Sequence, residues 1–362
     1  MTTALAVVGD DERPTVVLIN VGTPDAPTPS AVRRYLRAFL SDARVIDLPA
    51  LARWLLLHLV ILPLRPRRSA ALYRAIWTQQ GSPLLVHGRA LADALQAQLP
   101  EVRVVLGMRY GEPSLARAVA QARGRVVVVP LFPQEASATT GSALAETYRL
   151  LGAAARVPAA AVVPPFFHDD GFVEAVASPI VESTSAGVDA ILLSYHGVPV
   201  SQVQRTALDG HTCGGDDAAG CCAALGVANA GCYRAQCLAT SRALMERLRG
   251  AGVMAPVATS FQSRLGRARW IGPSPHDAIA TLARSGVKRL VVACPSFVAD
   301  CLETLEEIGV QARAQFLAAG GEHFTLVPCL NADPRFVEVL ARLVADALGR
   351  SLPPVSGSRR SS

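Results

Sequence analysis

The sequence has few of the features that mark several large classes of protein. It contains a single lysine, Lys288, and aromatic residues make up only 5% of the chain. The net charge of +6 is therefore carried by arginine, whose forked guanidinium group suits carboxylates and phosphates. No dense basic run with interleaved aromatic residues occurs, which argues against nucleic acid as a partner.

Long apolar segments are equally scarce. The opening residues, MTTALAVVGDDERP, have no basic segment followed by an apolar one, so we expect no secretory signal. The longest apolar run, Leu51–Leu64, is too short to span a bilayer and contains Arg53, His58 and Pro63. In such a protein the eight cysteines are expected to be reduced thiols or metal ligands rather than disulfides. We therefore expect a cytoplasmic protein.

What the sequence does contain is an alternation of short β-branched runs with longer segments of helical period. The short runs predict strands at Thr15–Asn20, Val102–Gly107, Val126–Pro130, Ala160–Val163, Ala190–Tyr195, Val257–Phe261, Leu290–Ala293 and Phe324–Pro328. The longer segments predict helices at Pro29–Leu40, Pro83–Gln98, Ser114–Arg123, Ala143–Gly152, Tyr233–Gly250, His276–Ser285, Leu302–Ala318 and Pro334–Leu348. This alternation indicates parallel sheets wound by right-handed crossovers and covered on both faces.

The pattern restarts near residue 185, so we predict an α/β fold of two similar halves with a cleft between them. The first half is placed at residues 14–172, with residues 333–350 packed back against it. The second half, residues 173–332, contains a Cys-rich insert at 210–237 that has no clear period. Residues 353–362 are expected to form a disordered tail.

Candidate functional residues follow the predicted strands. Ligands of parallel α/β sheets bind at the carboxyl ends of the strands, which directs attention to Asn20–Pro24, Met108–Gly111, Ser194–Pro199 and Phe261–Arg264. His196 lies in the third of these segments. A histidine at a strand end is more often a packed or capping residue, but the Gly-Val-Pro sequence after it favours a functional role, because glycine permits close approach of a ligand.

Two carboxylates near the end of the chain allow two interpretations. Glu303 and Glu307 are four residues apart and therefore share one face of a helix. They form either a solvated acidic first turn, which the helix dipole favours, or a ladder that relays protons or cations toward a buried base. The spacing alone favours the first interpretation.

The apolar run Leu51–Leu64 also allows two interpretations. It is followed by Arg65, Arg67 and Arg68. The segment is either an ordinary buried helix or a lip that rests on a membrane and admits a flat apolar ligand. The sequence favours neither interpretation over the other.

The cysteines are the most specific local signal. Five of the eight lie close together in one segment, at Cys213, Cys221, Cys222, Cys232 and Cys237. The absence of paired CxxC knuckles weakens a zinc interpretation. Four thiolates from one loop suit an iron–sulfur cluster, most simply a 2Fe-2S cluster. The other three cysteines, Cys294, Cys301 and Cys329, are expected to be structural.

Taken together, these residues resemble ferrochelatase, the terminal enzyme of protohaem synthesis. Six motifs carry the resemblance in order along nearly the whole chain: NVGTPDAPTPSAVRRYL (20–36), GSPL (81–84), GMRYGEPSL (107–115), SYHGVP (194–199), FQSRLGRARWIGPSP (261–275) and ADCLETLEEI (299–308). The resemblance implies two Rossmann-like halves with parallel sheets around a porphyrin cleft.

The resemblance also implies roles for individual residues. The family's active-site histidine and glutamate fall on His196 and Glu303, which would handle the Fe²⁺ substrate. The remaining implied positions are Arg109 and Tyr110 lining the cleft, Ser82 and Trp270 near the macrocycle, and Glu307 continuing an acidic path. Many bacterial relatives lack the Cys-rich insert, whereas Cys237 has a counterpart in cluster-free relatives. This favours Cys213, Cys221, Cys222 and Cys232 as ligands of the 2Fe-2S cluster, with Cys237 as the alternative.

The implied function is insertion of Fe²⁺ into protoporphyrin IX, which gives protohaem and releases two protons. The alternatives are a cobalt or nickel chelatase for a hydrophilic tetrapyrrole, a non-catalytic haem- or iron-binding protein, and an iron–sulfur redox carrier. The expected partners are protoporphyrin IX, Fe²⁺ and a peripheral membrane contact through residues 51–68 at the inner face of the membrane. The sequence leaves open whether the chain forms a homodimer.

Overall fold

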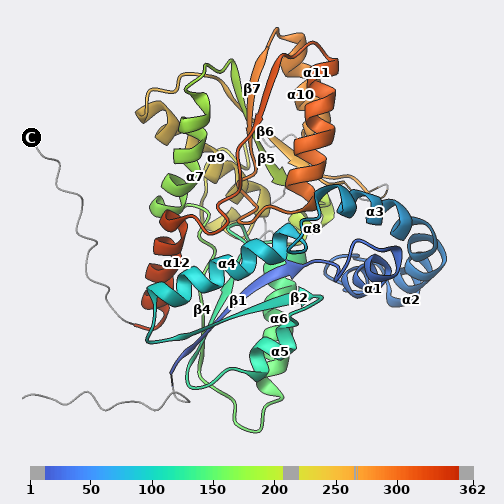
Figure 1. The fold of residues 1–362 in the computed structure, drawn as a ribbon, viewed down its shortest axis with the longest axis vertical. Coiled ribbons are helices and arrows are strands. Elements are labelled where there is room, and N and C mark those ends of the chain that lie inside the picture. The colour runs from blue at the N-terminus through green and yellow to red at the C-terminus, as the bar shows by residue number, and fades with distance from the viewer. Residues whose placement is uncertain (1–12, 207–219, 265, 267, 350–362) are drawn as a thin grey trace, which may run out of the picture.

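Two four-stranded parallel sheets form the framework of the protein (Figure 1). The computed structural model describes residues 13–206, 220–264, 266 and 268–349. The first sheet has the order β2-β1-β3-β4 and the second β6-β5-β7-β8. The strands are β1 (Thr15–Gly22), β2 (Arg103–Tyr110), β3 (Val126–Pro130), β4 (Ala160–Val162), β5 (Ala190–His196), β6 (Val257–Gln262), β7 (Arg289–Ala293) and β8 (His323–Leu326).

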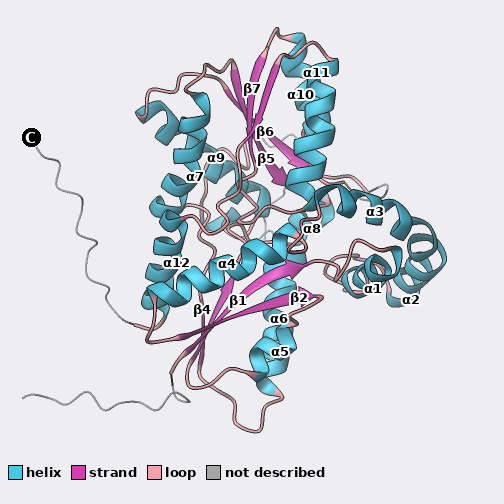
Figure 2. Ribbon diagram, viewed as in Figure 1, coloured by secondary structure: helices cyan, strands magenta, loops and turns pink. Residues whose placement is uncertain are grey.

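Helices pack against both sheets (Figure 2). Those preceding the second sheet are α1 (Pro29–Leu40), α2 (Ala50–Leu55), the π-helix η1 (Leu56–Ile61), α3 (Leu62–Ile76), α4 (Pro83–Gln98), α5 (Leu115–Ala120), the π-helix η2 (Ser137–Gly141), α6 (Ser142–Gly152) and α7 (Asp170–Thr184). Those that follow β5 are α8 (Val200–Arg205), the 3-10 helix η3 (Val227–Asn229), α9 (Tyr233–Gly250), α10 (Pro275–Arg284), the π-helix η4 (Glu303–Ala312), α11 (Arg313–Ala318) and α12 (Pro334–Ala347).

The strands form where the sequence supplies continuous apolar runs. All five residues of β3 are buried, because α12 packs near one side of the first sheet while α5 and α6 pack on the other. One hydrophobic core extends through both halves of the molecule: Leu18 of β1 and Leu193 of β5 belong to the same cluster of buried side chains. The ends of the two sheets are therefore held in a fixed relationship.

Most sequence predictions of secondary structure are confirmed. All eight predicted strands are present, and α1, α4 and α9 have the predicted bounds. Several strands extend further than predicted, so that Arg109 and His196 lie at the carboxyl ends of β2 and β5 rather than in loops. The sequence prediction missed α7, which contains Gly171 and Pro179, two residues that normally disfavour a helix interior. The predicted tail at 353–362 lies outside the described residues.

The apolar run near residue 51 is helical but is not an ordinary buried helix. Within α2, η1 and α3, Leu57 is 1% exposed, whereas Leu51, Leu59 and Leu64 are 70%, 65% and 71% exposed. This protruding helical segment, residues 50–76, lies beside α1 at one side of the molecule (Figure 1). None of the helices in the described ranges is long and apolar enough to cross a membrane.

Candidate active site at the ends of the two sheets

His196 is the last residue of β5 and is fixed through its backbone. Its N–H donates to the Ser296 hydroxyl at 2.9 Å, and its carbonyl oxygen accepts a hydrogen bond from the Tyr233 hydroxyl at 2.7 Å. The side chain is only partly buried. A rigid backbone with an accessible imidazole suits a functional rather than a packing role.

One hydrogen bond assigns the tautomer of the His196 imidazole. Nδ1 lies 2.6 Å from the carbonyl oxygen of Gly197. A carbonyl oxygen can only accept, so Nδ1 carries the proton and donates it. The lone pair of the neutral ring is therefore on Nε2, which is the atom able to accept a proton from a substrate.

Gly197 occupies a position where a side chain would collide with its neighbours. A Cβ added there would lie 2.7 Å from the Gln262 carbonyl oxygen and 3.4 Å from the Trp270 ring. The same close approach allows the Gly197 N–H to bond the Gln262 carbonyl at 2.7 Å. Trp270 also pairs with Pro199 through a β-bridge. The sequence-predicted Trp270 thus lies directly against the turn that follows His196.

Gln262 connects His196 with Glu303. It is fully buried at the end of β6, directly opposite His196 in the β5–β6 register. Its side-chain Nε2 donates to the Glu303 carbonyl at 2.8 Å, and its Oε1 accepts from the Ser194 hydroxyl at 2.7 Å. Three separate elements are therefore joined by one amide. Gln262 lies in the candidate segment Phe261–Arg264, but the sequence predicted no role for it.

Glu303 and Glu307 lie on the π-helix η4. The structure differs here from the single helix predicted over 302–318, because α-helical geometry begins only at Arg313. Both oxygens of Glu307 accept hydrogen bonds from Ser263. Burial raises the pKa of Glu307, the two hydrogen bonds from Ser263 partly oppose this, and smaller effects come from Glu303, which raises it, and His196, which lowers it. Glu307 is partly buried and held by Ser263, which argues against a freely solvated acidic turn; the carboxylate ladder stays a prediction.

A chain of hydroxyl groups from the first half faces Glu303. Tyr35 donates to the Gly22 carbonyl at 3.1 Å, and the side chain of Tyr73 lies close to those of Tyr35 and Thr23. Burial raises the pKa of Tyr73, and the neighbouring Tyr35 and the charge of Glu303 raise it further. These tyrosines were missed from the sequence because they occur inside helical segments.

Ser82 lies at the end of the same hydroxyl chain. It is 3% exposed and accepts a 2.7 Å hydrogen bond from the Thr23 hydroxyl. It precedes α4, whose Leu84 packs with Cys301 near the start of η4. The GSPL motif therefore helps to join the first half to the helix that carries the glutamates.

Arg109 and Tyr110 are held by one carboxylate. Asp42 accepts from the Arg109 guanidinium at 2.9 Å, from the Tyr110 hydroxyl at 2.8 Å and from Ser142 at 2.6 Å. The guanidinium carbon also lies 4.6 Å from the centre of the Tyr110 ring. Burial of Asp42 opposes its ionisation, but hydrogen bonds from Ser142 and Tyr110 and the charge of Arg109 lower its pKa. Asp42 was not identified from the sequence.

Three cysteines of the Cys-rich insert form a thiol cluster, Cys221, Cys222 and Cys232. The sulfur atoms of Cys221 and Cys222 lie 3.9 Å apart. The pKa of Cys222 is lowered, first by its hydrogen bond with Cys232 and then, against the effect of burial, by Arg234. Cys213 lies outside the described residues, and within those residues no group of three or more metal-ligating side chains has the arrangement of a metal site.

Cys237 differs from the thiol cluster. It is fully buried in α9, and burial raises the pKa of its thiol, although contact with the Tyr233 side chain partly opposes this. Cys294 and Cys301 are also buried, as expected for structural cysteines.

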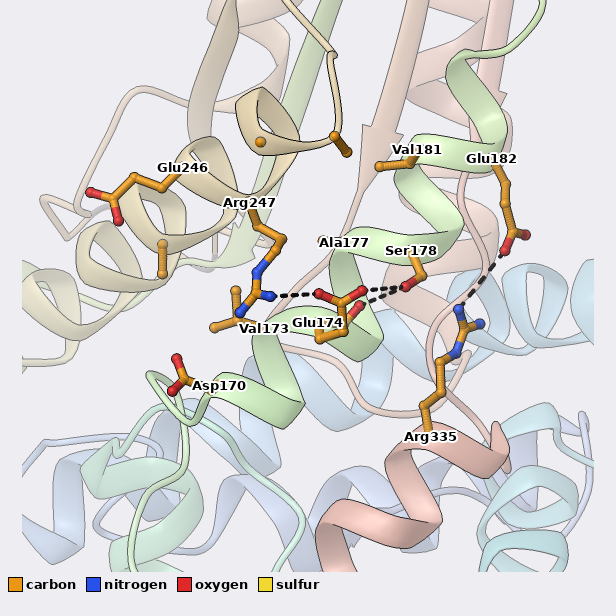
Figure 3. A pocket seen from close by; sticks show the side chains of 13 residues that line it. Asp170, Val173, Glu174, Ala177, Ser178, Val181, Glu182, Glu246, Arg247 and Arg335 are labelled. Atoms are coloured by element: carbon orange, nitrogen blue, oxygen red, sulfur yellow. Dashed lines mark hydrogen bonds and ion pairs between the residues drawn. The ribbon is translucent and has the colours of Figure 1, made fainter. Parts of the chain in front are cut away.

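A cavity of about 750 Å³ lies between α7, α9 and α12, away from this group of residues. Figure 3 shows Arg247 of α9 and Arg335 of α12 directed at Glu174 and Glu182 of α7. None of the sequence-predicted site residues lines this cavity. In it Arg247 pairs with Glu174 and Arg335 pairs with Glu182.

Sequence comparison identifies the family. A model of the ferrochelatase family matches residues 13–348. A ferrochelatase of Coxiella burnetii is 43% identical over 340 residues, covering 92% of this chain and 93% of its own. A ferrochelatase of Legionella pneumophila is 40% identical over 336 residues, covering 92% and 99%. The chain belongs to the ferrochelatase family. The family and the α/β fold predicted from the sequence are both confirmed.

The solved structures that match this ferrochelatase-family chain have lower sequence identity to it than these relatives. The SirB protein of Bacillus subtilis, solved with Fe³⁺, is 13% identical with a TM-score of 0.49, and the match covers 92% of this chain and 95% of that one. A multi-domain protein from Deinococcus radiodurans with structural similarity to chelatases is 15% identical with a TM-score of 0.48, covering 92% and 55%.

Proposed function

We propose that this chain inserts Fe²⁺ into protoporphyrin IX to give protohaem. Membership of the ferrochelatase family supports the reaction. The observation that carries the chemical assignment is the hydrogen bond from His196 Nδ1 to Gly197, because it leaves Nε2 as a proton acceptor at the end of β5. The enzyme is a lyase whose reaction involves no change of oxidation state.

His196 accepts protons from the macrocycle. Insertion of a divalent ion displaces two pyrrole protons, so a base is required near the ring nitrogens. A neutral imidazole with its lone pair on Nε2 performs this step, and the Gly197 carbonyl stabilises the imidazolium that forms by accepting from Nδ1.

Glu303 and Glu307 remove the proton and assist the metal ion. Glu303 balances the imidazolium charge or exchanges waters on Fe²⁺, since carboxylate oxygens bind hydrated divalent ions. Glu307 lies one step further along η4, and its raised pKa makes it able to hold a proton. Protons therefore leave the ring through His196 and then along the helix.

Arg109 and Trp270 are the proposed contacts of the porphyrin, whereas Ser82 and Tyr110 are buried and are proposed to shape the site through their hydrogen bonds. Trp270 lies against the turn after His196, and its ring provides a flat apolar surface. Arg109 remains partly exposed, at 21%, although Asp42 holds it. Its guanidinium keeps donors for a carboxylate of the substrate.

A 2Fe-2S cluster is the proposed resident cofactor. The chemistry of the thiol cluster supports this group, because adjacent sulfur atoms and the positive charge of Arg234 favour thiolates, although the described residues alone do not make up a metal site. We assign Cys213 as the fourth ligand and not Cys237, whose buried thiol faces Tyr233. Bound to these thiolates, the cluster would supply iron–sulfur bonds that tie residues 213–232 to α9.

The exposed leucines of α2, η1 and α3 support a membrane contact through residues 51–68. A large exposed apolar surface on a soluble fold is typical of an interaction site, and Arg65, Arg67 and Arg68 adjoin it. Such a surface would rest on the headgroup region of the inner face of the membrane and admit a poorly soluble porphyrin from the bilayer.

Metal insertion by the purified protein tests the function. Anaerobic protein is mixed with excess protoporphyrin IX and Fe²⁺, and the Soret band is followed. Many turnovers per protein molecule are expected. Activity confined to a hydrophilic tetrapyrrole with Co²⁺ or Ni²⁺ would instead indicate the other chelatase, and a spectral change that stops at one equivalent would indicate a binding protein.

A further inference from the structure

Tyr233, the first residue of α9, contacts the backbone of the proposed base. Its hydroxyl donates to the His196 carbonyl at 2.7 Å and also contacts the Ser296 side chain. Ser296 in turn accepts the hydrogen bond from the His196 N–H at 2.9 Å. Both backbone polar groups of His196 therefore depend on one small group of side chains. Tyr233 is 6% exposed, so water cannot readily replace its hydroxyl.

The residue before Tyr233 is a member of the thiol cluster. Cys232 is the N-cap of α9; its N–H donates to the Asn229 carbonyl at 2.9 Å, and its carbonyl accepts from the Gln236 N–H at 3.0 Å. A ligand bound to the Cys232 sulfur would therefore also fix the first turn of α9. Tyr233 is the next residue in that turn.

The rest of the described insert is tied to the same helix. Arg242 of α9 donates to the Cys222 carbonyl at 3.0 Å, and the Gln236 side chain donates to the Ala230 carbonyl at 2.7 Å. The buried Asn229 side chain donates to the Cys221 carbonyl at 2.7 Å. A change at the thiol cluster consequently reaches the start of α9 through several short hydrogen bonds.

We propose that Tyr233 is a positioning residue that couples the state of the thiol cluster to the orientation of His196. This inference rests on the function proposed above. A ligand on the thiols fixes the first turn of α9, so that the Tyr233 hydroxyl holds the His196 carbonyl and the imidazole presents Nε2. Without the ligand this turn loosens, and the proton-transfer step slows while porphyrin binding is unaffected.

Replacing one hydroxyl tests the positioning role. Tyr233→Phe is expected to lower kcat about tenfold and to change the porphyrin KM by less than about twofold. Tyr148→Phe is the control for the same substitution, because Tyr148 is 54% exposed and lies on α6, outside β5 and α9. The control should keep kcat within about twofold of the wild type. Equal losses in the two variants would overturn the proposal.

A double-substitution cycle tests the coupling. Cys222→Ser disturbs the thiol cluster without changing Tyr233 or its neighbours in sequence. It is expected to lower kcat about tenfold in the wild type and to have no further effect in Tyr233→Phe. Coupling would be contradicted if kcat of the double variant fell by the product of the two single losses. It would also be contradicted if Cys222→Ser alone did not lower kcat. If that variant does not fold, treatment of wild type and Tyr233→Phe with an iron chelator replaces it, with the same expected outcomes.

Hydrogen exchange provides a readout that requires no turnover. Exchange of the amide protons in residues 194–199 should accelerate in Tyr233→Phe, in Cys222→Ser and in chelator-treated wild type, and should remain unchanged in Tyr148→Phe. Unchanged exchange in Tyr233→Phe would overturn the coupling. A wild-type protein that inserts no metal would contradict the proposed function instead, and the exchange data would still decide the coupling.

Discussion

Ser263 supplies two hydrogen bonds to the carboxylate of Glu307, one from its backbone N–H at 2.8 Å and one from its hydroxyl at 2.5 Å. To do so it adopts a left-handed conformation, with φ of 67°, which is uncommon for a residue other than glycine. Such local strain persists where the surrounding structure requires it, often at functional sites. The end of β6 is thus shaped to hold a buried carboxyl group next to the proposed base.

The raised pKa of Glu307 predicts a pH dependence of stability. The folded protein binds this proton more tightly than the unfolded chain, so the free energy of unfolding falls as pH rises from about 4.5 through the folded-state pKa. Glu307→Gln removes the titrating group. Its free energy of unfolding should therefore fall less steeply over this range than that of the wild type.

Urea unfolding at several pH values measures the effect. Glu246→Gln is the control, because Glu246 is exposed on α9, and it should retain the slope of the wild type. Identical slopes for wild type and Glu307→Gln would show that Glu307 ionises freely in the folded protein.

The exposed apolar face of residues 51–64 should govern porphyrin entry. Replacing Leu51, Leu59 and Leu64 together by serine is expected to raise the porphyrin KM roughly tenfold, with a smaller change in kcat, and to weaken binding to anionic vesicles. Stability should change little because these side chains are already in contact with water. Met254→Ser, at a site 78% exposed elsewhere, should alter neither property. Unaltered KM and vesicle binding in the triple variant would remove the membrane role.

The Cys-rich insert should contain acid-labile sulfide. Anaerobically purified protein is expected to be reddish-brown, with iron and sulfide in equal amounts. Cys222→Ser should lose the colour and both elements, whereas Cys237→Ser should retain them because Cys237 packs in the core. Zinc without sulfide would indicate a zinc site. If Cys222→Ser kept its sulfide and Cys237→Ser lost it, Cys237 and not Cys222 would be a ligand of the cluster.

The fold could be predicted from the sequence wherever local signals agree. The short Val-rich run of β3 favours a buried strand. Thr28 with Pro29 marks the start of α1, where the threonine hydroxyl accepts from a backbone N–H. The signals failed for α7, where Pro179 lies inside the helix. Burial of the α7 side chains in the core common to both halves outweighs the local cost.

The candidate site was predictable at strand ends but not where contacts are long-range. His196 follows from its position after a strand and from its flanking glycine. Gln262 and Asp42 act through hydrogen bonds to residues far away in the sequence, which no local pattern records. Residues 303–312 pack against α3 and α10, and no sequence signal marks their π-helical form.

The most direct test of the account is the rate of Fe²⁺ insertion into protoporphyrin IX by His196→Ala at saturating iron. Removal of the proposed base is expected to lower kcat by about 10²–10⁴ while the protein remains folded, because only the side chain beyond Cβ is lost at a partly exposed strand end. His276→Ala, at a site 77% exposed, should retain the wild-type rate. A His196→Ala protein that inserts iron at a near-normal rate would contradict the assignment of His196 as the base.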